Sequence, residues 1–186
     1  VYEAMKAVDS GNGVLLIIKN YTGDVMNFEM AAELAEADGI KVAKVVVNDD
    51  VAVEDSTYTT GRRGIAGTVF VHKIAGALAE QGATLEEVEA VARKVIQNVK
   101  SMGMALSPCI VPAAGKPGFT LHDDEIEIGI GIHGEPGIEK TVIKSADETV
   151  KMLLEKILFD LRLKENDRVA VMVNGMGATP LMELYI

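Results

Sequence analysis

Short apolar segments alternate with a helical pattern along the first part of the chain, and this order leaves few folds open. Residues 14–18 are an unbroken apolar run of strand length, residues 25–37 follow a helical pattern, and residues 42–47 form another strand. Strands that alternate with helices are typical of a parallel sheet. The sequence therefore predicts an α/β fold.

Two more helices are expected before residue 105. Residues 85–102 carry apolar side chains at helical spacing, and Thr84 and Glu87 have the spacing of a capping box at the helix start. A further helical pattern covers residues 65–80, directly after a glycine- and arginine-containing loop at residues 59–64. Both helices continue the α/β order.

The composition changes between residues 107 and 118, where Pro, Gly, Ala and Lys replace the periodic patterns. We interpret this stretch as a domain connection. In a later turn, Pro136 presets the first central position and Gly137 supplies positive φ at the second. The elements expected after the connection are a strand at 126–132, a type II turn at 134–137, a helix at 146–160 and a strand at 168–173.

We therefore predict two α/β sandwich domains with mostly parallel or mixed sheets. The first occupies residues 1–105, and the second, which carries His133, occupies residues 106–186. The chain enters in mid-helix without a cap at Val1 and stops inside an apolar helical run at Ile186. We expect each domain to be represented only in part.

Composition excludes several classes of function. A net charge of -10 repels nucleic acids and anionic lipids, and no apolar run reaches the length of a membrane span. The single cysteine, Cys109, excludes an internal disulfide and a four-thiolate zinc site, and we predict a packing role for it. These features favour a cytoplasmic protein that accepts a small neutral substrate and binds neither nucleic acid nor membrane.

Lys19 and Asp24 lie between the carboxyl end of a predicted strand and the amino end of a helix, where open parallel sheets usually bind ligands. A lysine at this edge can orient an oxygen or an anion, although a solvated side chain is an equal alternative. Asp24 is also placed to act as a helix N-cap. The structural and functional roles of Asp24 can coexist.

His133 follows a predicted strand and precedes the glycine-containing turn, so small residues surround its ring. Taken by itself, a lone histidine in this position is more often a hydrogen-bonded structural residue than a catalyst. In its neutral form, however, the imidazole has a free lone pair that can attack a carbonyl carbon.

Other polar clusters are weaker candidates. We interpret Asp49, Asp50, Glu54 and Asp55 as a solvated loop, because their spacing does not match a calcium-binding loop. Residues 61–64 (Gly-Arg-Arg-Gly) could hold an anion at a helix start, but a surface loop or subunit contact is favoured. Residues 114–117 lack the complete pattern of a phosphate-binding loop, and we predict no metal site.

Five blocks of the sequence together resemble, in the same order, the substrate-binding subunit of the dihydroxyacetone kinase family. They span nearly the whole chain, which makes a chance similarity improbable. The blocks are residues 19–24 (Lys-Asn-Tyr-Thr-Gly-Asp), 59–64 (Thr-Thr-Gly-Arg-Arg-Gly), 111–117 (Val-Pro-Ala-Ala-Gly-Lys-Pro), 131–138 (Gly-Ile-His-Gly-Glu-Pro-Gly-Ile) and 177–180 (Gly-Ala-Thr-Pro).

The resemblance implies roles for three residues. His133 forms a covalent hemiaminal with the substrate carbonyl, Lys19 hydrogen-bonds the bound substrate, and Asp24 is the general base for the hydroxyl that receives phosphate. Covalent capture selects ketones and aldehydes, because glycerol has no carbonyl to attack. The family also places a second active-site histidine in a segment before Val1, so we expect the 186 residues alone to form an incomplete, inactive site.

The resemblance further implies that this chain binds no cofactor. ADP or ATP and Mg²⁺ belong to a partner subunit or domain, and in the bacterial type a phosphoenolpyruvate-driven phosphocarrier protein recharges that partner. A homodimer is implied, with Arg93 on an exposed helix face near the nucleotide-carrying subunit. An ordinary solvated role for Arg93 is an equal alternative.

Two other functions share these residues. One is a regulatory paralogue that senses dihydroxyacetone and acts as a transcriptional co-activator, and the other is a single-chain kinase that uses ATP. Lys19 and Asp24 favour the enzyme over the sensor, since a sensor has less use for a general base.

Overall fold

The protein is described by a computed structural model that covers residues 1–54, 59–108, 110 and 112–186. Asp55, Cys109 and Val111, which belong to features predicted above, lie outside the described residues. The observed elements combine one parallel and one antiparallel sheet with helices, which makes the fold mixed α/β. The division into domains at residues 105 and 106 stays a prediction.

The first sheet consists of two parallel strands, β1 (Val14–Lys19) and β2 (Val42–Val47). Val14 pairs with Val42 and Lys19 pairs with Val47, so both strands end at the same edge. Every second residue of β1 is buried, as expected for a strand whose two faces meet different layers. The predicted alternation of strand, helix and strand is confirmed.

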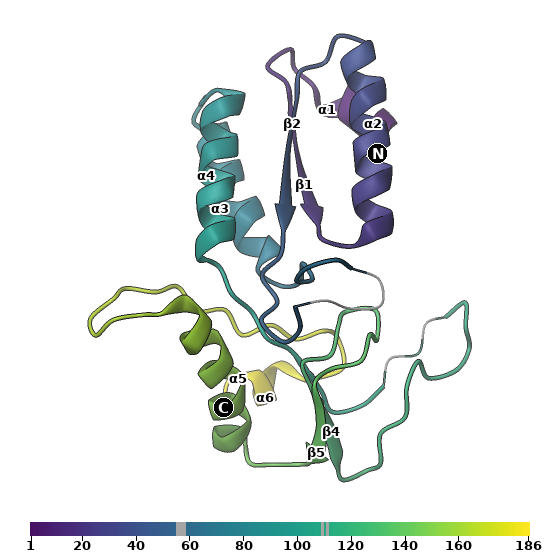
Figure 1. Ribbon diagram of the computed structural model, residues 1–186, viewed down its shortest axis with the longest axis vertical. Helices are drawn as coiled ribbons and strands as arrows, with labels where there is room; N and C mark the ends of the chain where they lie inside the picture. The colour runs from purple at the N-terminus through teal and green to yellow at the C-terminus, as the bar shows by residue number, and fades with distance from the viewer. Residues whose placement is uncertain (55–58, 109, 111) are drawn as a thin grey trace.

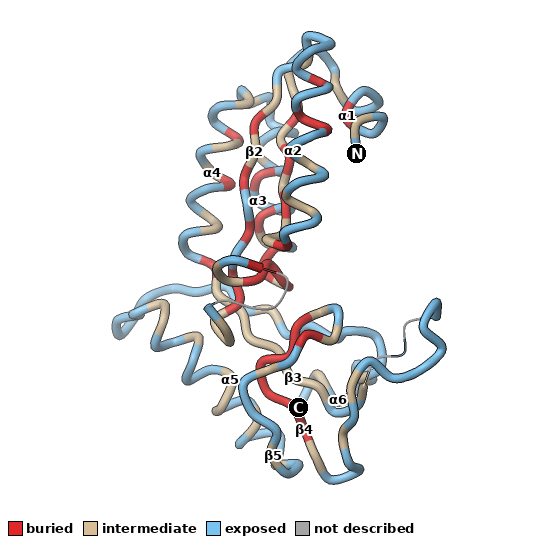
Figure 2. The backbone as a smooth tube through the Cα atoms, turned by 45° about the vertical axis from the view of Figure 1, so that its right-hand side comes forward, coloured by how far each residue is buried: buried red, intermediate tan, exposed pale blue. Residues whose placement is uncertain are grey.

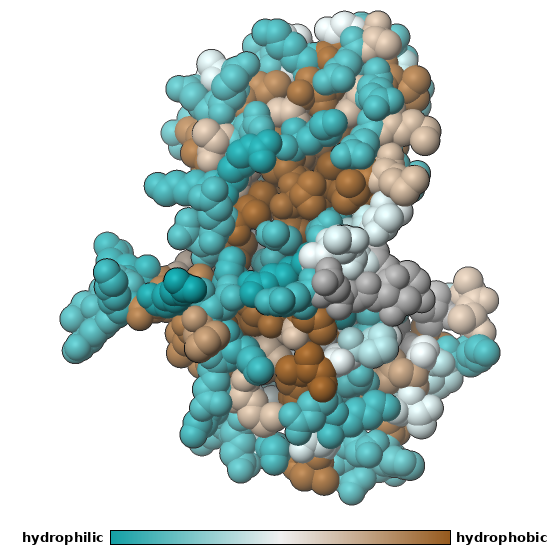
Figure 3. Space-filling view, in the orientation of Figure 1, coloured by the Kyte–Doolittle hydropathy of each residue, from teal (hydrophilic) through white to brown (hydrophobic). Residues whose placement is uncertain are grey.

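Helices cover both faces of this sheet (Figure 1). On one face lie α1 (Tyr2–Val8) and α2 (Thr22–Ala37), and three buried alanines of α2 let the helix approach β1 closely. On the other face lie α3 (Thr68–Glu80) and α4 (Leu85–Asn98), which pack on Val45 and Val47. Buried residues follow the sheet and the inner helix faces (Figure 2). Apolar side chains also gather on the visible surface between α2 and α4 (Figure 3).

The helix boundaries follow local chemistry. The predicted capping box is present at the start of α4, where Thr84 and Glu87 bond to each other's backbone amides. The helix ends at Asn98 because Val99 is extended, so it is shorter than the predicted range of 85–102. A second capping box, formed by Ser145 and Glu148, begins α5 (Ala146–Leu161), where a helix over 146–160 was predicted. No helix in the described part of the chain is both long and apolar enough to span a bilayer.

The second sheet is antiparallel and contains β3 (Met104–Ala105), β4 (Glu125–Ile128) and β5 (Glu139–Val142). β4 ends earlier than the predicted strand at 126–132, because Gly129 has a φ of +77° that breaks the ladder. The chain after β4 stays buried up to Gly131 and then enters the turn that carries His133.

Two predictions in this half are wrong. The tight turn closes through a hydrogen bond from Gly134 N to Gly131 O, and the positive φ is at Gly134 rather than at Gly137, so no type II turn forms at 134–137. Residues 168–173 pair with no strand in the described part of the chain, and Val171 is 74% exposed. An apolar β pattern forms a strand only where a neighbour accepts its hydrogen bonds.

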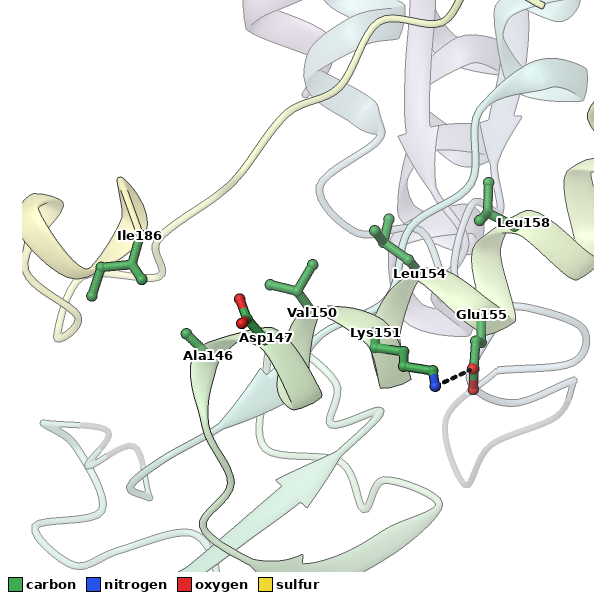
Figure 4. Close-up of a pocket in the computed structure, with 8 residues that line it drawn as sticks. All are labelled: Ala146, Asp147, Val150, Lys151, Leu154, Glu155, Leu158 and Ile186. Carbon is green, nitrogen blue, oxygen red and sulfur yellow. Dashed lines mark ion pairs between the residues drawn. The ribbon is translucent and has the colours of Figure 1, made fainter. Parts of the chain in front are cut away.

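One face of helix α5 carries apolar side chains, but none of the residues of this helix is buried. Val150, Leu154 and Leu158 follow one another at intervals of one helical turn and line a hollow of about 410 Å³, with Ile186 of the segment after α6 (Leu181–Leu184) across it (Figure 4). Lys151 and Glu155 pair at 3.9 Å on the rim. The side chains that line this hollow include no histidine, cysteine, serine or threonine.

A buried ion pair joins the loop before α3 to the end of β2. Arg63 and Asp50 are both 0% exposed, and Arg63 Nη2 lies 2.6 Å from Asp50 Oδ2. Arg63 Nη2 also donates to Gly129 O at 2.6 Å, and its Nη1 donates to Pro136 O at 3.5 Å. One guanidinium therefore links the first sheet to the backbone on both sides of the His133 turn.

Replacing Arg63 tests this link. We expect Arg63→Met to lower the free energy of unfolding by about 3–5 kcal/mol, because Asp50 is left buried without a counter-charge. The control is Arg62→Met at the adjacent position, where the pair with Asp160 is 27% and 22% exposed, and we expect a loss of about 0–1 kcal/mol. Urea unfolding of both variants measures the difference. Equal losses would contradict the assignment of Arg63 as the principal link.

Candidate functional site

The turn between β1 and α2 carries the first two predicted residues. Lys19 is the last residue of β1, and Asp24 is the third residue of α2. The predicted N-cap role of Asp24 is wrong, because the helix already begins at Thr22 and Tyr21 occupies the N-cap position. Asp24 still favours the helix as an acidic residue in its first turn.

The 59–64 loop closes over this turn. Asn20 Nδ2 donates to Thr60 O at 3.0 Å and to Arg62 O at 2.8 Å. Gly64 lies against the strand ends, where a Cβ would overlap Val47 O. The two sequence blocks are therefore packed together at the carboxyl edge of the parallel sheet, which is where ligands bind in such sheets.

His133 lies in the tight turn between Gly131 and Gly134, and its side chain is 57% exposed. It opens onto a hollow of about 470 Å³, which a three-carbon molecule can enter. The residues that line this hollow are Gly118, Phe119, Glu127, His133, Gly134, Glu135, Pro136 and Lys140. The imidazole is thus accessible from the outside, as a nucleophile requires.

Two residues that the sequence analysis did not single out hold the His133 ring. Glu135 Oε1 lies 3.0 Å from His133 Nδ1, and its Oε2 accepts a hydrogen bond from His133 N at 2.9 Å. Tyr21 meets the ring edge-on, with centroids 4.7 Å apart and planes at 85°. Through Tyr21, the histidine turn contacts the segment between Lys19 and Asp24, so the segments that carry the three predicted residues are adjacent.

Burial and hydrogen bonding set the charge of this cluster. Burial alone raises the pKa of Glu135, but hydrogen bonds from the His133 ring and from backbone amides outweigh it and lower this pKa below its usual value. Glu135 is therefore ionised at neutral pH. Burial and the nearby Glu135 charge raise the pKa of the Tyr21 phenol, which stays protonated.

The predictions for the acidic cluster and for residues 61–64 need correction. Asp49 and Asp50 are 0% exposed, so they do not form a solvated loop. Asp49 accepts hydrogen bonds from Ile65 N at 2.8 Å and Gly67 N at 2.7 Å, which fixes the start of α3. Arg63 is equally buried and is no surface residue. Among the described residues, no three His, Cys, Asp or Glu side chains are grouped to hold a metal ion.

Arg93 lies on α4, in the layer on the opposite side of the first sheet from α2. Its side chain is 55% exposed and pairs with Glu89 at 2.5 Å, while its Nη2 donates to Lys44 O at 2.9 Å. These contacts orient the guanidinium on the surface. A contact with a partner subunit stays a prediction.

Comparisons with known proteins identify the family. The Dak1 domain family matches residues 1–186, which is the whole chain. The chain belongs to the Dak1 domain family. The family resemblance stated from the five sequence blocks is thereby confirmed.

The relatives of this chain include kinase subunits and a regulator. The chain is 64% identical to the dihydroxyacetone-binding subunit of PTS-dependent dihydroxyacetone kinase 1 of Listeria innocua, with all of this chain and 56% of that protein covered. The dihydroxyacetone kinase of C. freundii superposes on 99% of the chain with a TM-score of 0.88 and 40% identity, over 33% of its own length.

A dihydroxyacetone kinase operon co-activator superposes on 99% of the chain with a TM-score of 0.90 and 36% identity, over 57% of its own length. The chain therefore shares its fold with a dihydroxyacetone kinase and with an operon co-activator. The chain spans little more than half the length of the Listeria innocua subunit, with 56% of that protein covered.

A glycine beside the histidine offers a direct test of the site's packing. A Cβ on Gly131 would overlap Glu135 Oε2 and lie 2.8 Å from Arg63 Nη1. We expect Gly131→Ala to destabilise the protein by about 1–3 kcal/mol, because the carboxylate must move.

Gly76 in α3 is the matched control, since nothing lies within 4 Å of its Cβ position. Gly76→Ala should stabilise the helix by about 0.5–1 kcal/mol. Thermal unfolding of the two variants gives opposite shifts if the packing is as described. A Gly131→Ala protein as stable as wild type would show that the carboxylate is not confined.

Proposed function

We propose that this chain is part of the dihydroxyacetone-binding subunit of a kinase that phosphorylates dihydroxyacetone. The observation that supports this proposal is the accessible imidazole of His133 at the mouth of a hollow. Its Nδ1 faces the buried carboxylate of Glu135. This arrangement leaves Nε2 as the reactive nitrogen. The name of the Listeria innocua relative supports the same substrate.

In this proposal, His133 forms a bond from Nε2 to the carbonyl carbon of the substrate, giving a hemiaminal. Lys19, at the end of β1, supplies a positive charge that holds a substrate oxygen. Asp24, in the first turn of α2, accepts the proton of the hydroxyl that attacks the phosphoryl donor. Tyr21 supports the proximity of these groups, because it contacts the His133 ring from the intervening segment.

The phosphoryl donor belongs to a partner in this proposal. In it, nucleotide and Mg²⁺ are bound by another subunit, and a phosphocarrier protein acts upstream. The Listeria innocua relative is named as the dihydroxyacetone-binding subunit of a PTS-dependent kinase, which supports a division of roles between subunits. We propose a cytoplasmic homodimer whose surface includes Arg93 at the contact with the nucleotide-carrying subunit. A single-chain kinase that uses ATP is the alternative arrangement.

Mass spectrometry of the full-length protein with dihydroxyacetone tests substrate capture. We expect a mass increase of one dihydroxyacetone, mapped to His133, and no increase with glycerol, because only a carbonyl carbon can accept the nitrogen lone pair. His133→Ala should abolish the adduct, while His122→Ala should retain it because His122 does not line the hollow beside His133. An adduct that persists in His133→Ala would overturn the proposal.

A second candidate function is a dihydroxyacetone-sensing co-activator, favoured by the superposition with the operon co-activator. Asp24→Asn separates the two. For the enzyme, we expect the adduct to form normally while phosphoryl transfer with the partner subunit falls about 10²- to 10⁴-fold. Glu29→Gln, an exposed change on the same helix, is the control. Wild-type protein that forms the adduct but transfers no phosphate would support the sensor.

A further inference from the structure

Glu135 uses both carboxylate oxygens on a single neighbour. Oε1 lies 3.0 Å from His133 Nδ1, and Oε2 lies 2.9 Å from His133 N. One contact fixes the backbone of the turn and the other fixes the rotation of the ring. The carboxylate is 1% exposed while the imidazole is 57% exposed, so the ring is held from the inside and open on the other side.

The charge on Glu135 decides which ring nitrogen carries the proton. An ionised carboxylate only accepts hydrogen bonds, so Nδ1 must be the donor and Nε2 keeps its lone pair. The low pKa of Glu135 keeps it ionised across the neutral range. In an isolated imidazole the Nε2–H form is available, and it has no lone pair at the exposed nitrogen.

We propose that Glu135 is a positioning residue that fixes the tautomer of His133 and holds its Nδ1 proton during capture of the ketone. This inference rests on the proposed function. In the step, the Nε2 lone pair bonds to the carbonyl carbon, and the C=O π pair moves to oxygen, which takes a proton from water. The water that gave this proton is left as hydroxide. The ring then releases its Nδ1 proton, which passes Glu135 into solvent and neutralises the hydroxide.

The surroundings keep this carboxylate in place. Gly131 N donates to Glu135 O at 3.0 Å, and the absence of a Cβ at Gly131 leaves room for Oε2. Arg63 holds the carbonyls of Gly129 and Pro136, on either side of the turn. A positioning role requires such a rigid support, because a misplaced nucleophile loses the benefit of orientation.

Glu135→Gln tests the tautomer directly. The backbone N–H of His133 is always a donor, so the glutamine oxygen must face it and the amide NH₂ must face Nδ1. Nδ1 then has to accept, and the ring proton moves to Nε2. We expect nitrogen NMR of the imidazole to report Nδ1–H in the wild-type protein and Nε2–H in Glu135→Gln, with adduct formation slowed at least about 100-fold.

Glu125→Gln is the matched control. Its carboxylate also accepts a hydrogen bond from a histidine backbone, from His122 N at 3.0 Å, but it belongs to β4 and supports no reactive ring. We expect this variant to keep the wild-type tautomer and rate. Both variants are checked for folding by urea unfolding before the rates are compared.

The outcomes separate the two proposals. Nε2–H in the ligand-free wild-type protein overturns the role of Glu135, even if Glu135→Gln does not fold. Adduct formation by folded Glu135→Gln at the wild-type rate overturns it as well. A wild-type protein that shows Nδ1–H but forms no adduct overturns the proposed function and leaves the tautomer assignment standing.

Discussion

The structure depends on one buried ion pair, between Arg63 and Asp50. Removing two charges from water costs several kcal/mol per ion, so such a pair persists only where further hydrogen bonds satisfy it. Here the guanidinium also bonds to the carbonyl oxygens of Gly129 and Pro136. Because these carbonyls lie on either side of His133, the pair that fixes the end of the parallel sheet also fixes the turn that carries the imidazole.

Support and exposure are divided between neighbouring side chains. Glu135 and Tyr21 are buried and contact the ring, while His133 itself faces the hollow. A side chain held only by solvent would spread over several rotamers, and part of the binding energy would be lost in ordering it. In the folded protein, Glu135 and Tyr21 already hold the His133 ring in one orientation, so no ligand is needed to order it.

The elements that the sequence predicted well are those with local determinants. The strands at 14–18 and 42–47 are apolar except for Lys44, with alternate residues buried, and α4 has a capping box beside an apolar stripe. Charged residues whose partners are distant in sequence were misjudged. Asp49, Asp50 and Arg63 look solvated because clustered charges usually are, and only the fold shows that they satisfy one another and the backbone.

The same distinction explains what was found in the site. His133, Lys19 and Asp24 stand out because each lies close to the end of a strand or the start of a helix. Lys19 and Asp24 lie at the carboxyl edge of the parallel sheet, where ligands usually bind, whereas His133 follows a strand of the antiparallel sheet. Glu135 and Tyr21 gave no such signal, since a glutamate in a turn is ordinary until its partner is known. A small neutral ketone offers few groups for selective hydrogen bonding, and similar polyols offer the same ones. In the proposed function, selectivity against polyols therefore comes from the carbonyl that accepts the nitrogen lone pair, and capture depends on the exposed Nε2 of His133 keeping that lone pair.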